Sequence, residues 1–203
     1  KCKYMGAYLT TDVTSTKEVK VRLPTATSAM TRLTRIWKSN DISFRVKHRL
    51  YKSLVVSILL YGCEAWTLTA QYEKKIAAFE TKQFRKLLGI SYREHRTNEY
   101  VRQKIKELVG EQEPLLATVK RRKLTFFGHT IRHNSLNKTI VQGTLEGQRR
   151  RGRPRKSWLS NILEWTEMEL TDVLTAAQGR DEWRMIARTA ALRSPLRPQR
   201  SRD

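Results

Sequence analysis

Apolar residues recur at spacings of three and four through most of this sequence, and this periodicity constrains the fold more than any other feature. The clearest case is the segment 44–61, whose apolar residues are Val46, Leu50, Leu54, Ile58 and Tyr61. At about 3.6 residues per turn, this spacing places all five side chains on one helix face, which we expect to be buried. The same pattern recurs in 24–39, 70–88, 98–109, 114–132, 155–170 and 181–192. The sequence therefore predicts a mainly α-helical fold.

Local signals set the expected ends of these helices. A capping-box pattern at Ser15–Glu18 predicts a helix that starts near residue 16. Because a proline inside a helix costs roughly 3 kcal/mol, we expect that helix to stop and a second one to open at Pro24. Gly62 and Gly89 are expected to end the helices that precede them.

Four segments depart from the helical pattern. Residues 3–10 are rich in Tyr, Leu and Thr and predict one N-terminal β-strand or hairpin remnant within 1–14. Residues 134–157 hold four Gly or Pro residues and few large apolar ones, which favours a loop. A break at 110–113 is expected to separate a helical domain over 15–110 from a second small helical subdomain over 111–192, with a short turn or helix near 171–178. The tail 193–203 contains two prolines, and we expect it to be disordered.

The charge of the chain indicates a polyanionic partner. The formal net charge is +22, and residues 120–160 hold 12 Lys and Arg but one acid. Such a concentration attracts nucleic acid, DNA or RNA, better than it serves general solubility. No membrane association is expected, since the longest apolar run, 54–61, is too short to span a bilayer. Two cysteines form neither a disulfide framework nor a zinc pattern, which favours a reducing, intracellular compartment.

Residues expected to contact phosphates fall into two clusters. Six of the ten residues in 147–156 are cationic, and one glycine and one proline interrupt them. These residues are Arg149, Arg150, Arg151, Arg153, Arg155 and Lys156. The cations of 120–123 are expected to extend the same surface from the outer face of a helix; they are Lys120, Arg121, Arg122 and Lys123.

The run 147–156 allows two interpretations. An extended Arg-Gly-Arg-Pro, here residues 151–154, is similar to the core of an AT-hook, which lies in a narrow A·T minor groove. Alternatively, the run holds phosphates without reading the base sequence. Trp158, which follows closely, could stack on a base, but the first apolar residue of a helix more often joins the core.

No catalytic or metal constellation is apparent. The five aspartates are scattered, with none adjacent to another, so the carboxylate pair of a two-metal enzyme is not predicted. His129 and His133 are spaced i, i+4 and could share a zinc ion, but no third ligand lies near them in sequence. We assign no catalytic residue and no metal ligand.

Eight segments, in order, resemble one family. They are 3–6 (KYMG), 35–37 (RIW), 51–54 (YKSL), 60–68 (LYGCEAWTL), 85–90 (RKLLGI), 121–129 (RRKLTFFGH), 147–158 and 179–184 (GRDEWR). Together they resemble the C-terminal part of the endonuclease-reverse transcriptases of non-LTR, LINE-type retrotransposons. The resemblance covers nearly the whole chain, although Pro24 departs from the continuous helix that is usual in the family.

The resemblance implies a role in an RNA-directed DNA polymerase. Tyr4, Met5 and Gly6 would match the primer grip at the end of the palm, and 15–110 would match the thumb, whose helices hold template–primer. The residues that follow 110 would form a nucleic-acid-binding C-terminal extension. The chain lacks the palm's Asp pair, so Mg²⁺ is expected only for that missing palm, and the chain alone is expected to be inactive. Because the sequence opens without Met, we expect a fragment of a longer protein, located in the nucleus or in a cytoplasmic ribonucleoprotein.

A stand-alone AT-hook-like DNA-binding protein is the alternative hypothesis. In it the helices would serve only as a scaffold, and binding would prefer A·T sequences through Arg153.

Overall fold

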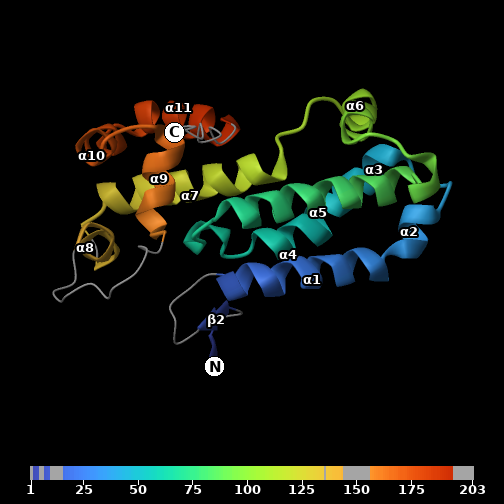
Figure 1. Cartoon of the computed structure of the whole chain (residues 1–203), viewed down its shortest axis with the longest axis horizontal. Helices are drawn as coiled ribbons and strands as arrows, with labels where there is room; N and C mark the ends of the chain where they lie inside the picture. The colour runs from blue at the N-terminus through green and yellow to red at the C-terminus, as the bar shows by residue number, and fades with distance from the viewer. Residues whose placement is uncertain (1, 5–6, 10–15, 135, 144–155, 194–203) are drawn as a thin grey trace, which may run out of the picture. The chain divides into compact units, whose positions relative to one another are not determined.

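The computed structural model describes residues 2–4, 7–9, 16–134, 136–143 and 156–193, and Figure 1 shows the order of its elements. It is mainly helical, as the periodicity predicted. The chain divides into two compact units, Lys1–Val119 and Lys120–Asp203, each described by itself below. The boundary expected from sequence lay earlier, at 110–113, and that domain division stays a prediction. At the N-terminus β1 (Cys2–Tyr4) pairs antiparallel with β2 (Ala7–Leu9).

The first unit is built from helices around one apolar core. They are α1 (Thr16–Arg32), α2 (Thr34–Lys38), α3 (Phe44–Leu50), the π-helical segment η1 (Tyr51–Val56), α4 (Ser57–Leu60), α5 (Ala70–Leu88), α6 (Asn98–Val109) and the start of α7 (Leu115–Arg132). Short 3₁₀ turns η2 (Cys63–Ala65) and η3 (Tyr92–Glu94) join them. α1 packs on η1 and α4, and α5 packs on α6. Met30, Val55, Leu59, Leu68 and Ile76 have no exposed surface.

The predicted break at Pro24 is wrong, because α1 continues through it. Val19, Ala26 and Met30 lie on one face of α1 and are fully buried. This apolar stripe begins before the proline and continues after it, so one continuous helix keeps Val19 on the same buried face as Ala26 and Met30. Pro24 itself is exposed. The burial of the stripe therefore outweighs the cost of the proline.

The helix predicted over 44–61 forms as α3, η1 and α4, but its buried face differs from the predicted one. Val46, Leu54 and Tyr61 are 44%, 42% and 50% exposed. The buried stripe instead consists of His48, Tyr51, Val55 and Leu59. Its members are also three or four residues apart, so the segment carries two competing stripes. Tyr51 and His48 pack against the ring of Phe84, with Tyr51 edge-on and its ring centroid 5.9 Å away; sequence periodicity alone does not reveal that contact.

Glycines end two helices as predicted. Gly62 follows α4 and Gly89 caps α5, with φ of 67° and 69°. Both lie in the left-handed region that favours glycine. α6 occupies the predicted range 98–109 and begins at Thr97, whose hydroxyl accepts a hydrogen bond from the Tyr100 amide at 3.2 Å.

In the described part of the second unit, the later part of α7 is followed by four helices. These are α8 (Leu136–Gln142), α9 (Trp158–Thr166), α10 (Leu170–Gln178) and α11 (Arg180–Leu192). α8 lies inside the segment predicted to be a loop, so that part of the prediction is wrong. Its Leu136 and Ile140 are 75% and 66% exposed. These two apolar residues are thus not part of the core.

Candidate nucleic-acid interface

A shallow groove in the first unit gathers positive charge. It has a volume of about 410 Å³ and runs along α5 beside the start of α6. Its charged lining residues are all cations: Lys74, Lys82 and Arg85 from α5 and Arg102 from α6. We call these four residues and the space between them the basic groove. Lys74, Ala78, Lys82 and Arg85 follow one another at spacings of three and four, so they share one face of α5.

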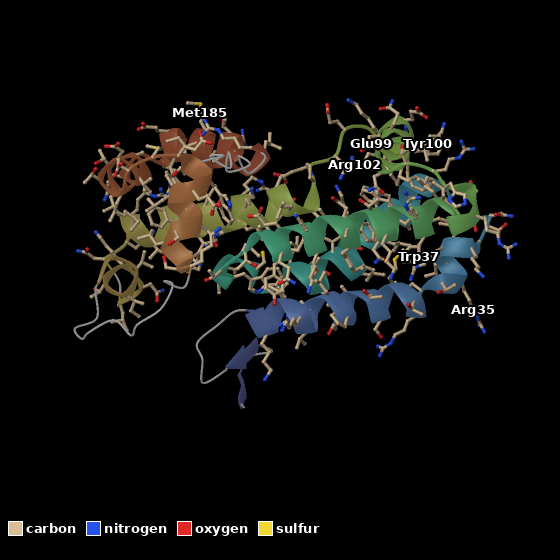
Figure 2. The ribbon with its side chains drawn as sticks, viewed as in Figure 1. Arg35, Trp37, Glu99, Tyr100, Arg102 and Met185 are labelled. Carbon is tan, nitrogen blue, oxygen red and sulfur yellow. The ribbon has the colours of Figure 1, made fainter. Side chains whose placement is uncertain are left out.

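The four cations of the basic groove are not equivalent. Arg85 uses one guanidinium nitrogen, Nη2, to donate to the backbone oxygen of Arg96 at 2.7 Å and to Oδ1 of Asn98 at 3.0 Å. It thereby fastens the segment from which α6 starts. Lys74, Lys82 and Arg102 are exposed to solvent. Figure 2 labels Arg102 on α6 next to Glu99 and Tyr100, and Glu99 does not line the groove.

A cavity adjoins the basic groove. It has a volume of about 390 Å³ between α5, α6 and the first turn of α7, and Ala77 and Arg102 line both spaces. Its apolar walls include Phe84, Ile105 and Leu116.

Two carboxyls line this cavity: Glu111 forms an ion pair with Lys106, and the second carboxyl is that of Glu80. Its Oε1 accepts a hydrogen bond from the Leu115 amide at 2.9 Å. Burial raises the pKa of Glu80, while that hydrogen bond and the positive charges of Arg102 and Lys52 oppose the rise. Glu80 thus presents a hydrogen-bonding oxygen beside apolar walls, whereas the neighbouring groove presents only positive charge.

Lys120 and Lys123 do not lie on the outer face of α7, where they were predicted. They are 1% and 0% exposed. Lys120 Nζ donates to the Arg193 backbone oxygen at 3.3 Å, and Lys123 Nζ donates to Asn161 Oδ1 at 3.0 Å. Both ammonium groups also lie over the ring of Trp165, 5.2 and 5.3 Å from its centroid. Their charges therefore point into the second unit and offer no surface contact for phosphate.

The physical reason for this correction lies in α9. Two tryptophans there, Trp158 and Trp165, offer ring faces that attract cations, and the Lys123 ammonium is 4.6 Å from the Trp158 centroid. Asn161 lies one turn from both on the same helix and supplies an oxygen acceptor. A charge pattern within α7 alone carries no information about these partners. Burial, and secondly the charge of nearby Lys156, lower the pKa of Lys123 to about 7.

The other predicted contact residues have mixed placements. Arg122 is exposed and Arg121 half-buried on α7. Lys156 is half-buried and forms an ion pair with Glu164 of α9. Arg149, Arg150, Arg151, Arg153 and Arg155 lie outside the described residues. In the predicted primer grip, Tyr4 belongs to β1, while Met5 and Gly6 lie outside the described part of the chain.

Trp158 is half-buried and belongs to the packing of the second unit. Its ring lies against Phe126 and Phe127, with centroids 6.3 and 6.2 Å away. His129 and His133 are exposed with their ring centroids 4.3 Å apart. Across the described ranges, no three His, Cys, Asp or Glu side chains come close enough to hold a metal ion. Likewise, no helix in the described part is both long and apolar enough to cross a membrane.

The sequence analysis missed the basic groove. A detectable signal was present, because the cations of 70–88 recur at helical spacing on the face opposite to Ile76 and Phe79. That signal could not show that Arg102, more than a dozen residues along the chain, would complete the groove.

Comparison with known proteins finds a relative from a mobile element. The chain is 27% identical over 153 residues to an uncharacterized transposon-derived protein of Caenorhabditis elegans. The match covers 71% of this chain and 54% of that protein, so the chain spans about half the length of the curated relative it matches. No protein-family profile matches the chain. No solved structure matches it either.

Proposed function

We propose that this chain is a nucleic-acid-binding part of a LINE-type reverse transcriptase that holds template–primer or target DNA and carries out no catalysis by itself. One observation carries the proposal: among the described residues, the basic groove is lined by four cations and no carboxylate. Phosphate contacts supply most of the affinity of such interfaces, and a nearby carboxylate would repel the same phosphates.

The spacing of the groove's cations suits a polynucleotide backbone. Lys74 and Arg85 are about 16 Å apart along the axis of α5 at 1.5 Å per residue. That length is close to five base-pair steps of about 3.4 Å. Arg102 lies across the groove, on α6. One strand can therefore follow α5 while cations contact it from both sides.

The narrower assignment rests on two independent supports. The eight ordered segments that resemble LINE-type reverse transcriptases span the described helices as well as the basic run. The similarity to a transposon-derived protein agrees with an origin in a mobile element. In this proposal α1 to α6 belong to the thumb, and the second unit belongs to the C-terminal extension.

The salt dependence of binding tests the basic groove. We would measure the affinity of the chain for duplex DNA of mixed sequence at several salt concentrations. The triple variant Lys74→Gln, Lys82→Gln, Arg102→Gln should flatten the slope of log K against log salt by about 2–3, since each phosphate contact contributes roughly 0.9. Arg85 is left intact because it also fastens the start of α6.

A matched control separates a local contact from total charge. Lys20, Lys38 and Lys86 are exposed cations of the same unit that do not line the groove. Their triple substitution by Gln removes the same net charge and should change the slope much less. Equal slopes for the two triple variants would refute the groove as the binding surface. Nucleotide incorporation in a primer-extension assay would refute the absence of catalysis.

A further inference from the structure

We propose that the cavity beside the basic groove takes up one unpaired nucleobase from a single strand whose phosphates lie in that groove. The inference rests on the proposed function and adds a ligand class to it, namely single-stranded nucleic acid with an unstacked base. A duplex with all its bases paired could use the groove but not the cavity.

The connection between the two spaces is the first argument. Ala77 and Arg102 line both the groove and the cavity, so a strand held in the groove passes the cavity entrance. The side chain at the boundary on α5 is only a methyl group, which leaves room for a planar ring to enter. Arg102 can meanwhile hold the phosphate next to the inserted base.

The size and walls of the cavity are the second argument. Its volume of about 390 Å³ lies at the lower end of the roughly 300–1,000 Å³ of small-molecule pockets. Phe84, Ile105 and Leu116 supply apolar surface for the faces of a base. Pockets that receive extruded bases combine such walls with a few polar groups for the pairing edge.

Glu80 supplies that polar group. Its Oε1 is held by the Leu115 amide, which leaves Oε2 to accept from a ligand. Every nucleobase has at least one N–H donor on its pairing edge, so Glu80 can bind any of them. In the cavity the carboxylates of Glu80 and Glu111 offset the two cations of its lining, Arg102 and Lys106, whereas the charged residues lining the groove are all cations. The positive charge of the groove therefore favours binding of the phosphate there, and the base binds in the cavity.

The test compares two ligands that carry the same phosphates. One is oligothymidylate of about 12 nucleotides, a length typical of single-strand sites, and the other is an abasic chain of the same length. The full chain should bind oligothymidylate about tenfold more tightly, a preference that burial of one base can supply. Counterion release is equal for the two ligands, so the ratio of their affinities reports on the bases alone.

Two neighbouring alanines form a matched pair of variants. Ala77 lines both spaces, whereas Ala78 lines only the groove. Ala77→Met places a flexible side chain at the cavity entrance and should reduce the preference to below about threefold. Ala78→Met should leave the preference intact. If Ala77→Met also weakens binding of the abasic chain, Leu116→Trp fills the cavity from α7 and is judged by the same criterion.

The outcomes separate this inference from the proposed function. A preference that survives both Ala77→Met and Leu116→Trp overturns the base pocket. In that case, weaker binding of both ligands by Lys74→Gln, Lys82→Gln would still support the groove. If the double variant binds both ligands as tightly as the wild type does, the groove fails, and the base pocket fails with it.

Discussion

Trp183 packs directly on Gly128. A Cβ atom at residue 128 would overlap the indole ring of Trp183, and the indole N–H donates to the backbone oxygen of Leu124 at 2.8 Å. Trp183 is 2% exposed, and its ring also contacts Phe127 at 5.4 Å between centroids. α7 and α11 can therefore approach this closely only because residue 128 has no side chain.

Gly128→Ala is expected to destabilise the protein. In an open helix this change adds up to about 1 kcal/mol of stability, but here we expect a loss of about 2–4 kcal/mol through steric overlap and a disturbed hydrogen bond. Urea unfolding followed by tryptophan fluorescence measures the loss. Thr125→Ala, at an exposed position of the same helix, should stay within about 0.5 kcal/mol. A Gly128→Ala protein more stable than the wild type would contradict the packing.

Gln83 is expected to be a destabilising residue. It has no exposed surface, and neither amide atom has a hydrogen-bond partner among the described residues. Gln83→Leu keeps a similar volume and removes the unpaired polar atoms, so it should raise the free energy of unfolding by about 1–2 kcal/mol. Gln103→Leu, at an exposed site on α6, is the control and should have little effect. A marked loss of stability in Gln83→Leu would show that the amide has a partner in solution.

Lys123 is expected to make stability depend on pH. The pKa of this lysine falls from its usual 10.5 to about 7, first through burial and second through the charge of Lys156. Between these two values the unfolded chain binds the proton and the folded chain does not, so stability rises with pH across that window. The hydrogen bond to Asn161 and the two tryptophan rings favour the charged form and reduce the effect.

The variant Lys123→Met isolates this contribution. Between about pH 6.5 and about pH 9.5, the wild type should gain on the order of 2–3 kcal/mol of unfolding free energy relative to the variant. Urea unfolding of both proteins at the two pH values measures the difference. Because Lys123 is buried, the salt slope of DNA binding should be the same for both. A flatter salt slope for Lys123→Met would show that this lysine does contact the nucleic acid.

The basic run 147–156 is expected to contact phosphates without selecting sequence. Arg153→Ala should weaken binding to A·T-rich and to mixed duplexes by the same factor, and it should reduce the salt slope by about 1. Parallel titrations of the two duplexes measure this. Loss of an A·T preference on the same substitution would instead favour the AT-hook-like alternative.

Helix existence and helix ends could be predicted well, because both depend on local sequence. Gly62 and Gly89 end their helices for a backbone reason that no distant contact can change. The range of α6 follows from its own apolar spacing and its Thr97 cap. Pro24 and α8 are exceptions. The burial of Val19 and Met30 against other helices decides whether α1 continues, and α8 forms in a segment with few large apolar residues.

Helix orientation could not be predicted, because it depends on partners elsewhere in the chain. The segment 44–61 carries two apolar stripes, and the contact with Phe84 selects the one that includes Tyr51. The sequence of α7 predicted that Lys120 and Lys123 lie on a solvent-exposed face. In the structure, α9 places two tryptophans and Asn161 beside them. The basic groove also needs two helices: three of its four cations lie on α5 and the fourth on α6, so neither helix alone reveals it.

Arg85 connects the proposed binding surface with the integrity of the fold. Lys74 and Lys82 could be lost from a diverging lineage of this sequence without loss of structure, whereas loss of Arg85 would also release the start of α6. In copies that no longer bind nucleic acid but still fold, the two lysines should drift while Arg85 persists. The order in which substitutions appear at these three positions would therefore show whether nucleic-acid binding or the fold was lost first.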